Sequence, residues 1–514
     1  MSESLQPIGH YIGGQDVFEG DVIDHHNPAD YDDVVARSHD GTPAIMDQAV
    51  NAAHEAFERW ADVTPSLRGK VLLNAANLLN TPAWREKFVK AMVAEIGKTA
   101  GGADGEVSKT VNILQYMGGL PTHTRGDVIS GDQPNVHMYT TSEPVGVAGL
   151  VTPFNFPLAV TVWKLAAALA AGCTTVIKPS PFAPMTSALI VELFQEAINM
   201  VPALKGANIG QGVINVVHGG PDIVSALIRN QLIQAISFTG STEAGKSILR
   251  QAMTREPMPL DPVHFLAEMG GHNAILVLAD ANLDMAVSAA VTGMAIGEGQ
   301  RCTATKRILV DEAVADQFLE SFLAQLARLN VGPGNDPASD VGPLVSSQAL
   351  DSVMAAISTS QANGMELLYG GQRLADGIHA MGNFMTPTVL KGDHRNPEHL
   401  ALRREIFGPV AGFGIVHGLQ EGITAVNDST HRHVAGVFTE SLRAGKEFLR
   451  AVKTGMRHWN NSTLGGDVQA PFGGAGGDTS FGPQEMGRRA MEIFQRHATV
   501  GEHYGAKVLG GRTR

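Results

Sequence analysis

The sequence predicts an α/β fold with two Rossmann-like lobes, each built on a parallel sheet, and a separate hairpin. Strand and helix patterns alternate over 145–253 and again over about 273–462, which is typical of doubly wound parallel sheets. Residues 122–143 instead alternate at every second position around Gly131-Asp132-Gln133-Pro134, which predicts a hairpin. A chain of 514 residues is long enough for two or three compact lobes.

The N-terminal part predicts short strands followed by helices. Residues 8–40 carry turn signals between short strand patterns, and Thr42 and Pro43 have the residue types of a helix N-cap and first helical position. The apolar stripe of that helix consists of Ile45, Val50, Ala53, Phe57 and Trp60. Further helical patterns follow near 66–79, 83–98 and 103–118.

The first alternating region predicts strands at 145–151, 174–178, 212–217 and 235–238, and helices at 157–171, 185–200, 221–230 and 242–253. Ligands of such sheets bind outside the carboxyl ends of the strands. Those ends carry Pro153-Phe154-Asn155, Lys178-Pro179-Ser180, His218-Gly219-Gly220 and Thr239-Gly240-Ser241, so we expect a binding site there. The glycine-rich tail from 464 predicts a helix and then a strand near 496–503.

The composition limits the partners. A net charge of −13 leaves no basic field for nucleic acid or an anionic membrane, so we expect neither. Two cysteines make no disulfide framework, and we predict no metal site. Residues 1–15 do not resemble a signal peptide, and Lys164 interrupts the most apolar run, 159–177, which predicts a buried helix and strand. We therefore expect a cytoplasmic protein.

Cys302 is the expected chemical centre. It lies in a loop, 297–304, whose glycines allow a tight turn or a close approach to a ligand. The neighbouring Arg301 guanidinium and the peptide N–H groups favour the thiolate, which is the nucleophilic form. Cys173 lies in an apolar run, and we expect it to be a small buried hydrophobe.

Four other polar residues each have two interpretations, and the residues alone leave them open. Glu268 is a general base or a solvated loop carboxylate. Asn155 donates to an oxyanion or caps the following helix. Lys178 binds a ribose hydroxyl or a phosphate, or it is a solvated strand-end lysine. Glu405 accepts hydrogen bonds from a ribose, or it is a charged turn residue.

One motif indicates a different function. The run Gly240-Ser-Thr-Glu-Ala-Gly245-Lys246-Ser247 matches the phosphate-loop pattern G-x-x-x-x-G-K-[ST] after a strand, and Asp280 ends an apolar strand pattern. These features alone are compatible with an ATPase. No G-x-G-x-x-G motif occurs.

Seven segments, in order along almost the whole chain, resemble motifs of the NAD(P)-dependent aldehyde dehydrogenase family. They are TPFNFP (152–157), IKPS (177–180), FTGSTE (238–243), AEMGG (267–271), GQRC (299–302), EIFGP (405–409) and PFGG (471–474). Each is weak alone, but seven in order are specific. Phe154 stands where tryptophan is usual. In this family the turn at Gly240 faces the cofactor without wrapping phosphates, so the resemblance makes the phosphate-loop match a coincidence.

The resemblance implies oxidation of an aldehyde to a carboxylate with NAD(P)+. Cys302 would form a thiohemiacetal and a thioester, Asn155 and the Cys302 N–H would hold the oxyanion, and Glu268 would activate the hydrolytic water. Lys178 and Glu405 would hold the two riboses. The remaining predicted cofactor residues are Pro153, Phe154, Ser180, Gly219, Phe238, Gly240, Ser241, Met269 and Phe407. A non-catalytic structural member is the other alternative, against which the three catalytic residues argue.

The resemblance also implies a division of the chain. Residues 1–121 and 144–266 would form a cofactor-binding domain, and 267–463 a catalytic domain. Residues 122–143 and 464–514 would form an oligomerisation hairpin with a C-terminal segment, which implies a homodimer or a homotetramer.

Three departures bear on specificity. Pro181 stands where NAD-preferring members often carry a glutamate for the adenosine ribose, so NADP+ is expected to be accepted. Arg301 and Phe472 are the predicted substrate residues, and the text around Cys302 most resembles members acting on 2-oxoglutarate semialdehyde. The alternative for Arg301 is that it points away and only holds the loop. Gly474-Ala475-Gly476 lacks a lysine common in the family, and we have no explanation for this.

Overall fold

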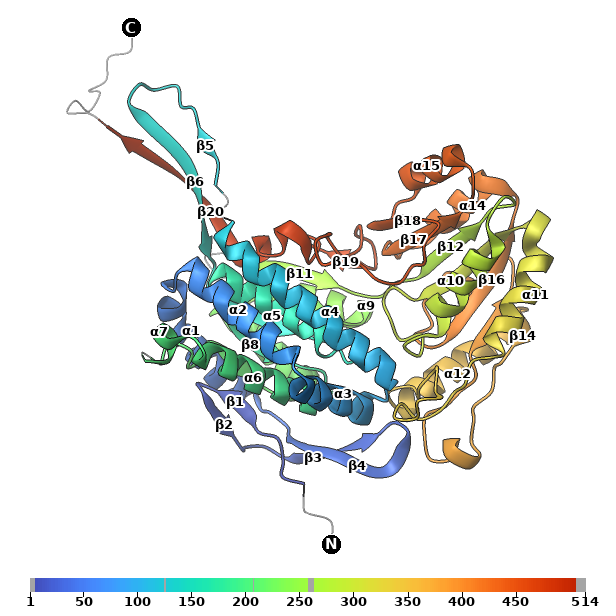
Figure 1. Ribbon diagram of the computed structural model, residues 1–514, viewed down its shortest axis with the longest axis horizontal. Coiled ribbons are helices and arrows are strands. Elements are labelled where there is room, and N and C mark those ends of the chain that lie inside the picture. Colours follow the sequence, from blue (N-terminus) through green and yellow to red (C-terminus); the bar gives the residue numbers. More distant parts are fainter. Residues whose placement is uncertain (1–4, 124–125, 207, 258–262, 505–514) are drawn as a thin grey trace.

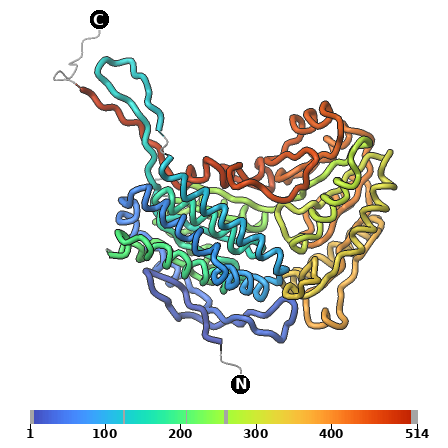
Figure 2. The backbone as a smooth tube through the Cα atoms, in the orientation of Figure 1, coloured from blue at the N-terminus to red at the C-terminus, as the bar shows by residue number. Residues whose placement is uncertain are grey.

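The computed structural model describes residues 5–123, 126–206, 208–257 and 263–504. Two α/β lobes lie side by side, and a three-stranded arm projects from the first (Figures 1 and 2). The predicted fold class, two parallel-sheet lobes with a hairpin, is therefore confirmed. No helix in the described part of the chain is long and apolar enough to cross a membrane.

The N-terminal part forms four strands and four long helices. The strands are β1 (His10–Ile12), β2 (Gln15–Val17), β3 (Val22–Asn27) and β4 (Asp30–His39). The helices are α1 (Pro43–Ala61), α2 (Pro65–Leu79), α3 (Pro82–Ile96) and α4 (Ala100–Gly119), followed by the 3-10 turn η1 (Leu120–Thr122). Thr42 caps α1 as predicted, because its hydroxyl accepts the Ile45 N–H and Pro43 needs no partner.

The first sheet has the order β19-β11-β10-β7-β8-β9-β1-β2. Its remaining strands are β7 (Val147–Val151), β8 (Thr174–Lys178), β9 (Ile214–Val216), β10 (Ile233–Thr239), β11 (His264–Glu268) and β19 (Ser480–Phe481). Its helices are α5 (Ala159–Ala171), α6 (Pro184–Asn199), α7 (Pro202–Lys205), α8 (Pro221–Arg229) and α9 (Thr242–Met253). The chain runs from β7 outward to β8 and β9, then returns to β10 on the other side of β7. This reversal places a ligand crevice at the carboxyl ends of β7 and β10.

The second sheet has the order β14-β15-β16-β13-β12-β17-β18. Its strands are β12 (Asn273–Val277), β13 (Thr305–Asp311), β14 (Glu366–Tyr369), β15 (Thr388–Lys391), β16 (Val410–Val416), β17 (Val434–Phe438) and β18 (Met456–Trp459). The accompanying helices are η2 (Glu312–Val314), α10 (Leu283–Ala295), α11 (Ala315–Leu326), α12 (Ser347–Ala362), η3 (Gly377–His379), α13 (Leu400–Arg403), α14 (Gly418–Asn427) and α15 (Leu442–Ala451). All neighbouring strands are parallel except β14 and β15.

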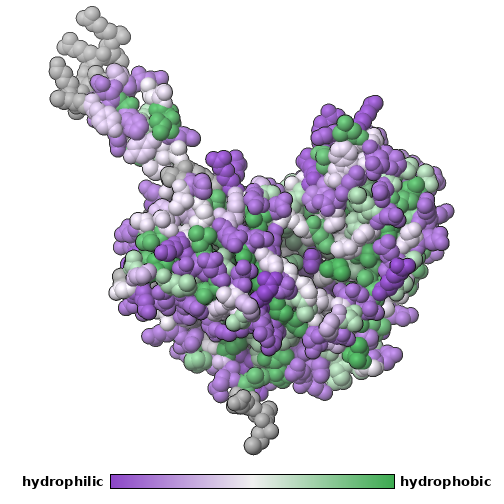
Figure 3. Space-filling view, viewed as in Figure 1, coloured by the Kyte–Doolittle hydropathy of each residue, from purple (hydrophilic) through white to green (hydrophobic). Residues whose placement is uncertain are grey.

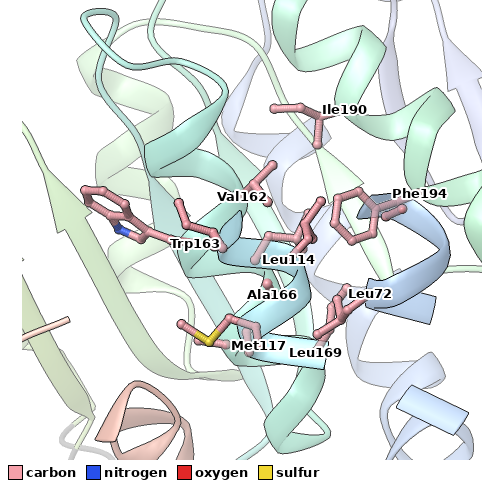
Figure 4. Packing of buried hydrophobic residues seen from close by; sticks show 14 of the residues in the cluster. Leu72, Leu114, Met117, Val162, Trp163, Ala166, Leu169, Ile190 and Phe194 are labelled. Atoms are coloured by element: carbon pink, nitrogen blue, oxygen red, sulfur yellow. The ribbon is translucent and has the colours of Figure 1, made fainter. Parts of the chain in front are cut away.

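Helix α5 lies at the centre of the first lobe, and every residue of it is buried. It packs against α4 and α2 on one side and covers the sheet on the other, which explains why this run is alanine-rich and continuously apolar. Figure 4 shows this packing through the side chains of Leu72, Leu114, Met117, Val162, Ala166, Leu169 and Phe194.

The arm consists of β5 (Val128–Ile129), β6 (Val136–Pro144) and β20 (Gln495–His503), with β20 antiparallel to β6 along its whole length. The predicted strand near 496–503 is therefore present. The predicted tail helix is wrong: only the 3-10 turns η4 (Gly487–Arg489) and η5 (Glu492–Phe494) occur there. Met486 and Gly487 have positive φ angles of 57° and 61°, which a right-handed helix does not accept.

Candidate active site

A cleft of about 1850 Å³ lies between the two lobes. The first lobe contributes the strand-end segments after β7, β8 and β10, and the second contributes the Cys302 loop and residues 403–407. The surface is hollowed between the lobes on the face shown in Figure 3. The crevice expected from the order of the strands is therefore real, and residues remote in sequence meet in it.

Residues 297–304 are here named the nucleophile loop after the expected role of Cys302. The backbone at the start of this loop is strained. Gly297, Glu298 and Gly299 have successive positive φ angles of 70°, 57° and 60°. A non-glycine residue such as Glu298 keeps this conformation only where surrounding contacts enforce it. Here the buried Glu298 carboxylate accepts the Gly342 N–H at 3.1 Å. The strain turns the chain sharply and places Cys302 on the cleft wall.

Three side chains hold the nucleophile loop, of which Asn273 and Lys306 are buried and Asn155 is partly buried. The Asn155 amide donates to Gln300 O at 2.7 Å. Asn273, at the start of β12, donates to both Cys302 O at 2.7 Å and Ala304 O at 2.8 Å. The Lys306 ammonium donates to Gly299 O at 2.7 Å. These hydrogen bonds fix backbone carbonyl groups before and after Cys302 in the loop, and so hold the Cys302 sulfur in place.

The capping interpretation of Asn155 is wrong. Helix α5 begins two residues later than predicted, and its first free N–H groups, those of Leu158 and Ala159, both donate to the Glu106 carboxylate at 2.9 Å. The Asn155 side chain lies in the cleft beside the nucleophile loop instead.

Glu268 is the last residue of β11 and is only 2% exposed, so the solvated-loop alternative is also wrong. Its Oε2 accepts the Gly474 N–H at 3.1 Å, and its Oε1 is buried without a partner among the described residues. Burial, followed by the charge of nearby Glu485, raises the pKa of Glu268 well above its ordinary value. A carboxyl group in this state has the proton affinity of a general base.

Arg301 and the Cys302 N–H favour the Cys302 thiolate, as expected, but stronger effects oppose them. Burial raises the pKa of Cys302 to about 12, and the carboxylates of Glu268 and Glu405 add to the effect. The Cys302 N–H and the Arg301 charge act in the opposite direction but are weaker. Burial, with the two facing carboxylates as smaller causes, therefore favours the protonated thiol.

Arg301 does not point away from the cleft. It lines the wall next to Cys302, with its guanidinium carbon 5.1 Å from the centre of the Phe156 ring. Its Nε is buried with no hydrogen-bond partner among the described residues. A buried donor without a partner is costly. The charges that act on this guanidinium are the carboxylates of Glu298 and Glu106, followed by Cys302.

A buried ionic network lies beneath Glu268 and was missed by the sequence reasoning. The Lys164 ammonium pairs with the Glu485 carboxylate and donates to Ser237 Oγ at 2.9 Å. The Trp163 indole N–H donates to Glu485 at 3.0 Å. Lys164 was noted only as an interruption of an apolar run, although a lysine at that position needs a buried partner.

The wall formed by the first lobe carries the predicted cofactor residues. Lys178 is 5% exposed, which excludes a solvated lysine, and its ammonium donates to Gly219 O at 3.2 Å. Burial lowers the pKa of Lys178 to about 8, with Asp40 acting in the opposite direction. Across the cleft, Glu405 accepts the Gly271 N–H at 2.9 Å and is held on the same wall as Cys302.

Most of the other predicted residues also line this cleft. They are Pro153, Phe154, Ser180, Phe238, Gly240, Ser241, Met269, Phe407 and Phe472. The rings of Phe154 and Phe407 meet edge to face with centroids 6.1 Å apart, so they join the two lobes. Gly219 is not among the lining residues and reaches the site only through its carbonyl on Lys178. Cys173 is buried elsewhere, as expected.

The phosphate-loop match has no phosphate-loop geometry. A phosphate loop keeps the segment between its two glycines as a non-helical loop, but here Ser241 caps α9 and the helix begins at Thr242, so most of that segment is helical. Lys246 therefore lies in the second turn of the helix, where its ammonium pairs with Asp478 at 2.6 Å. No cluster of three or more metal-ligating side chains occurs within the described residues.

The fold and the cleft define an α/β oxidoreductase of the dinucleotide-dependent class. The chain belongs to the aldehyde dehydrogenase family, whose model matches residues 17–500. It is an NAD(P)-dependent aldehyde dehydrogenase, and the ATPase alternative is not supported.

Similar proteins cover nearly the whole chain. The 2,5-dioxopentanoate dehydrogenase of Saccharolobus solfataricus is 35% identical over 93% of this chain and 95% of its own. The α-ketoglutaric semialdehyde dehydrogenase of Bacillus subtilis is 33% identical over 96% of each chain. Among solved structures, betaine aldehyde dehydrogenase from Staphylococcus aureus in complex with NAD+ has a TM-score of 0.90 at 26% identity, covering 98% of this chain and 96% of its own.

The residues present fit a nicotinamide dinucleotide. The Thr239 hydroxyl is buried without a partner among the described residues, so it is available to a ligand. A Cβ at Gly240 would lie 2.5 Å from the Phe238 ring, and the backbone there stays bare beside the N-terminus of α9. Bare backbone at a helix N-terminus suits a pyrophosphate, and Lys178 and Glu405 suit ribose hydroxyls.

Proposed function

We propose that Cys302 is the nucleophile, that Asn155 and the Cys302 N–H hold the oxyanion, and that Glu268 is the general base. The observation that carries this assignment is the convergence of these three side chains, from three remote segments, in one cleft. Strand β11 ends at Glu268, the segment after β7 carries Asn155, and the strained loop carries Cys302.

The proposed reaction has two halves. The Cys302 sulfur bonds to the aldehyde carbon and loses its proton, while the Asn155 amide and the Cys302 N–H stabilise the negative oxygen. The bound cofactor supplies the hydride acceptor, and the adduct becomes a thioester. Glu268 then removes a proton from water, the water oxygen bonds to the carbonyl carbon, and the carbon–sulfur bond breaks to release a carboxylate. The unpartnered Oε1 of Glu268 supports this last role.

The test is cofactor reduction measured by absorbance with a panel of aldehydes. We expect Cys302→Ala to produce no reduced cofactor at all. Glu268→Gln should give one burst equal to the enzyme concentration and then very slow turnover, because it forms the thioester but hydrolyses it poorly. If the wild type reduces neither cofactor with any aldehyde, or if Cys302→Ala retains turnover, the assignment is wrong.

The proposed substrate is a semialdehyde that carries a carboxylate. Arg301 supports this proposal because its guanidinium lines the cleft beside Cys302 without a buried partner for its Nε. The names of the two relatives, both semialdehyde dehydrogenases, point the same way. Phe472 is proposed to line the apolar part of the pocket with Trp163, since their ring centroids are 5.3 Å apart.

Paired substrates test the role of Arg301. Arg301→Leu should lower kcat/KM for glutarate semialdehyde about 100-fold, the usual cost of losing a charge-assisted pair, and leave that for pentanal nearly unchanged. Equal changes for the acidic and the neutral aldehyde would remove Arg301 from substrate recognition and leave it a structural part of the loop.

NADP+ is the proposed alternative to NAD+. Pro181 lines the cleft next to Ser180 and brings no carboxylate to repel a 2′-phosphate, while Lys178 brings a cation. Pro181→Glu should weaken NADP+ binding about tenfold or more and leave NAD+ binding similar, which equilibrium titration measures. A wild type with equal efficiency on both cofactors, or with a strong NAD+ preference, contradicts a preference for NADP+.

The arm is proposed to join copies of the chain into a homodimer or homotetramer. β5 and β20 are the edges of its sheet, and Val128 on β5 is 78% exposed. An open edge with exposed apolar residues pairs readily with another chain. Light scattering should give two or four times the 54.3 kDa chain mass, and a monomer would contradict the proposal. The division into cofactor, catalytic and oligomerisation domains and the cytoplasmic location also remain proposals.

A further inference from the structure

Lys306 is a buried cation that the proposed reaction does not use. It is the second residue of β13 and is 1% exposed. Its ammonium donates to Gly299 O at 2.7 Å and to Gly408 O at 2.6 Å. Gly299 belongs to the nucleophile loop, and Gly408 belongs to residues 405–409, here named the cofactor turn. One side chain therefore fastens two functional segments that are about a hundred residues apart.

The nucleophile loop and the cofactor turn are in direct backbone contact at this point. A Cβ on Gly299 would lie 2.2 Å from Gly408 O and 2.7 Å from the Pro409 Cα. The two carbonyl oxygens are buried acceptors, and each needs a donor. Lys306 supplies both donors, so a shift of the cofactor turn is passed to the nucleophile loop through the ammonium as well as through the backbone.

Lys306 also supplies the positive charge that opposes the burial of Glu405. Burial raises the pKa of Glu405 to about 7, while the hydrogen bond from the Gly271 N–H and then the charge of Lys306 lower it. Burial also lowers the pKa of Lys306 to about 8. The other titratable groups that face the pair are Cys302 on the side of Glu405 and His272 on the side of Lys306. Burial lowers the pKa of His272 well below its ordinary value, so that ring is neutral.

His431 also approaches this region. Its Nε2 lies 3.3 Å from the Cβ position of Gly270, which is itself 2.2 Å from the Glu405 carboxylate. Burial lowers the pKa of His431, so this ring is neutral at pH 7 and above. The next residue along β13, Arg307, points away and donates to His272 O, Ala425 O and Val426 O.

We propose that Lys306 is a positioning residue that couples the cofactor turn to the nucleophile. It ties the turn that carries Glu405 to the loop that carries Cys302, so that Glu405 is held for the cofactor and cofactor binding is felt at Cys302. The inference rests on the proposed cofactor role of Glu405. It predicts that the loss of Lys306 acts on cofactor binding in a pH-dependent way, which a purely structural lysine would not do.

The first test measures the Kd of the cofactor by titration without aldehyde, between pH 6 and pH 9. Lys306→Met should raise the Kd at pH 7 about tenfold, because each unit by which the pKa of Glu405 rises removes most of its carboxylate form. The Kd should recover toward the wild-type value at pH 9. Lys306→Arg keeps the charge and the donors, so its Kd should stay within about threefold of the wild type. In a Glu405→Gln background, Lys306→Met should add no pH dependence.

Arg307→Met is the matched control, because it removes another buried cation of β13 that donates to no carbonyl of the nucleophile loop or the cofactor turn. It should lower the melting temperature without changing the pH dependence of the Kd. If Lys306→Met does not fold, as judged by circular dichroism, Lys306→Gln keeps a donor without the charge and should show the same pH-dependent Kd.

The second test measures alkylation of Cys302 by iodoacetamide with and without saturating cofactor. The cofactor should change the rate several-fold in the wild type and Lys306→Arg, and should leave it unchanged in Lys306→Met. The proposal is overturned if a folded Lys306→Met, or Lys306→Gln in its place, matches the wild type in Kd at every pH. It is equally overturned if the wild-type alkylation rate ignores the cofactor. Failure of the proposed function is a different result, namely no cofactor reduction by the wild type with any aldehyde.

Discussion

Replacing Asn273 by alanine should loosen Cys302 from the second sheet. Asn273 is 2% exposed, and its amide donates to Cys302 O at 2.7 Å and to Ala304 O at 2.8 Å. Its Oδ1 accepts the Val434 N–H at 3.0 Å. The side chain therefore satisfies three buried backbone groups on two segments, and alanine satisfies none of them.

The expected magnitude follows from these three groups. Each buried backbone group left without a partner costs about 1–3 kcal/mol, so the full loss is about 3–9 kcal/mol. Water that enters the vacated polar space recovers part of it, and we expect a decrease of about 3–5 kcal/mol in the free energy of unfolding. A displacement of Cys302 by about an ångström also lowers kcat about 100-fold.

Asn215 provides a matched control. It is fully buried on β9, donates to Thr175 O and Gly212 O, and accepts the Gly13 N–H, so it satisfies the same number of groups outside the cleft. Urea denaturation should give similar stability losses for Asn273→Ala and Asn215→Ala. Only Asn273→Ala should lose kcat and change the rate of Cys302 alkylation under conditions where both variants are folded.

Two outcomes would refute this reasoning. A stability loss below about 1 kcal/mol for Asn273→Ala would mean that the three backbone groups find other partners. A loss of kcat no larger than that of the Asn215 control would mean that the nucleophile loop does not depend on Asn273.

Three further predictions concern the cleft and its surroundings. A Cβ on Gly473 would lie 2.1 Å from Glu268 Oε1, so Gly473→Ala should lower kcat about 100-fold. A Cβ on Gly270 would lie 2.2 Å from Glu405 Oε2, so Gly270→Ala should mainly raise the cofactor Kd. The reverse pattern in titration and turnover would contradict the assigned roles. Burial raises the pKa of Glu268 above its ordinary value of 4.5, so the carboxyl takes up a proton when the chain folds. The contribution of this proton uptake to the free energy of unfolding is complete below pH 4.5 and is lost as the pH rises through the folded pKa. Thermal unfolding of Glu268→Gln should therefore show a gain over the wild type at pH 8 and none at pH 4, and a loss at pH 8 would contradict the raised pKa. Lys246→Ala should change the free energy of unfolding by less than about 1 kcal/mol, because the Lys246–Asp478 ion pair is partly exposed. Neither the wild type nor Lys246→Ala should hydrolyse ATP. Hydrolysis by the wild type that Lys246→Ala abolishes would restore the phosphate-loop interpretation.

Local patterns predicted most of the elements because they depend on neighbours in sequence. Helix α1 begins where Thr42 and Pro43 predict it, and strand β8 has the predicted bounds. The predicted tail helix is absent because the backbone has positive φ angles at Met486 and Gly487, which the local sequence did not indicate. Intrinsic propensity gives way to tertiary context at such points.

The sequence by itself determined the class of the protein and indicated Cys302 as the candidate nucleophile. Seven short segments in order, with Cys302 in one of them, are enough for that, because each segment is local and its residue types are readable directly. Only the tertiary structure excluded the solvated interpretations of Glu268 and Lys178 and the capping interpretation of Asn155. It also revealed Asn273, Lys306 and the Lys164–Glu485 pair, none of which forms a recognisable motif. The physical reason is that burial and facing charges, which set a pKa and fix a loop, come from residues remote in sequence and exist only once the chain has folded.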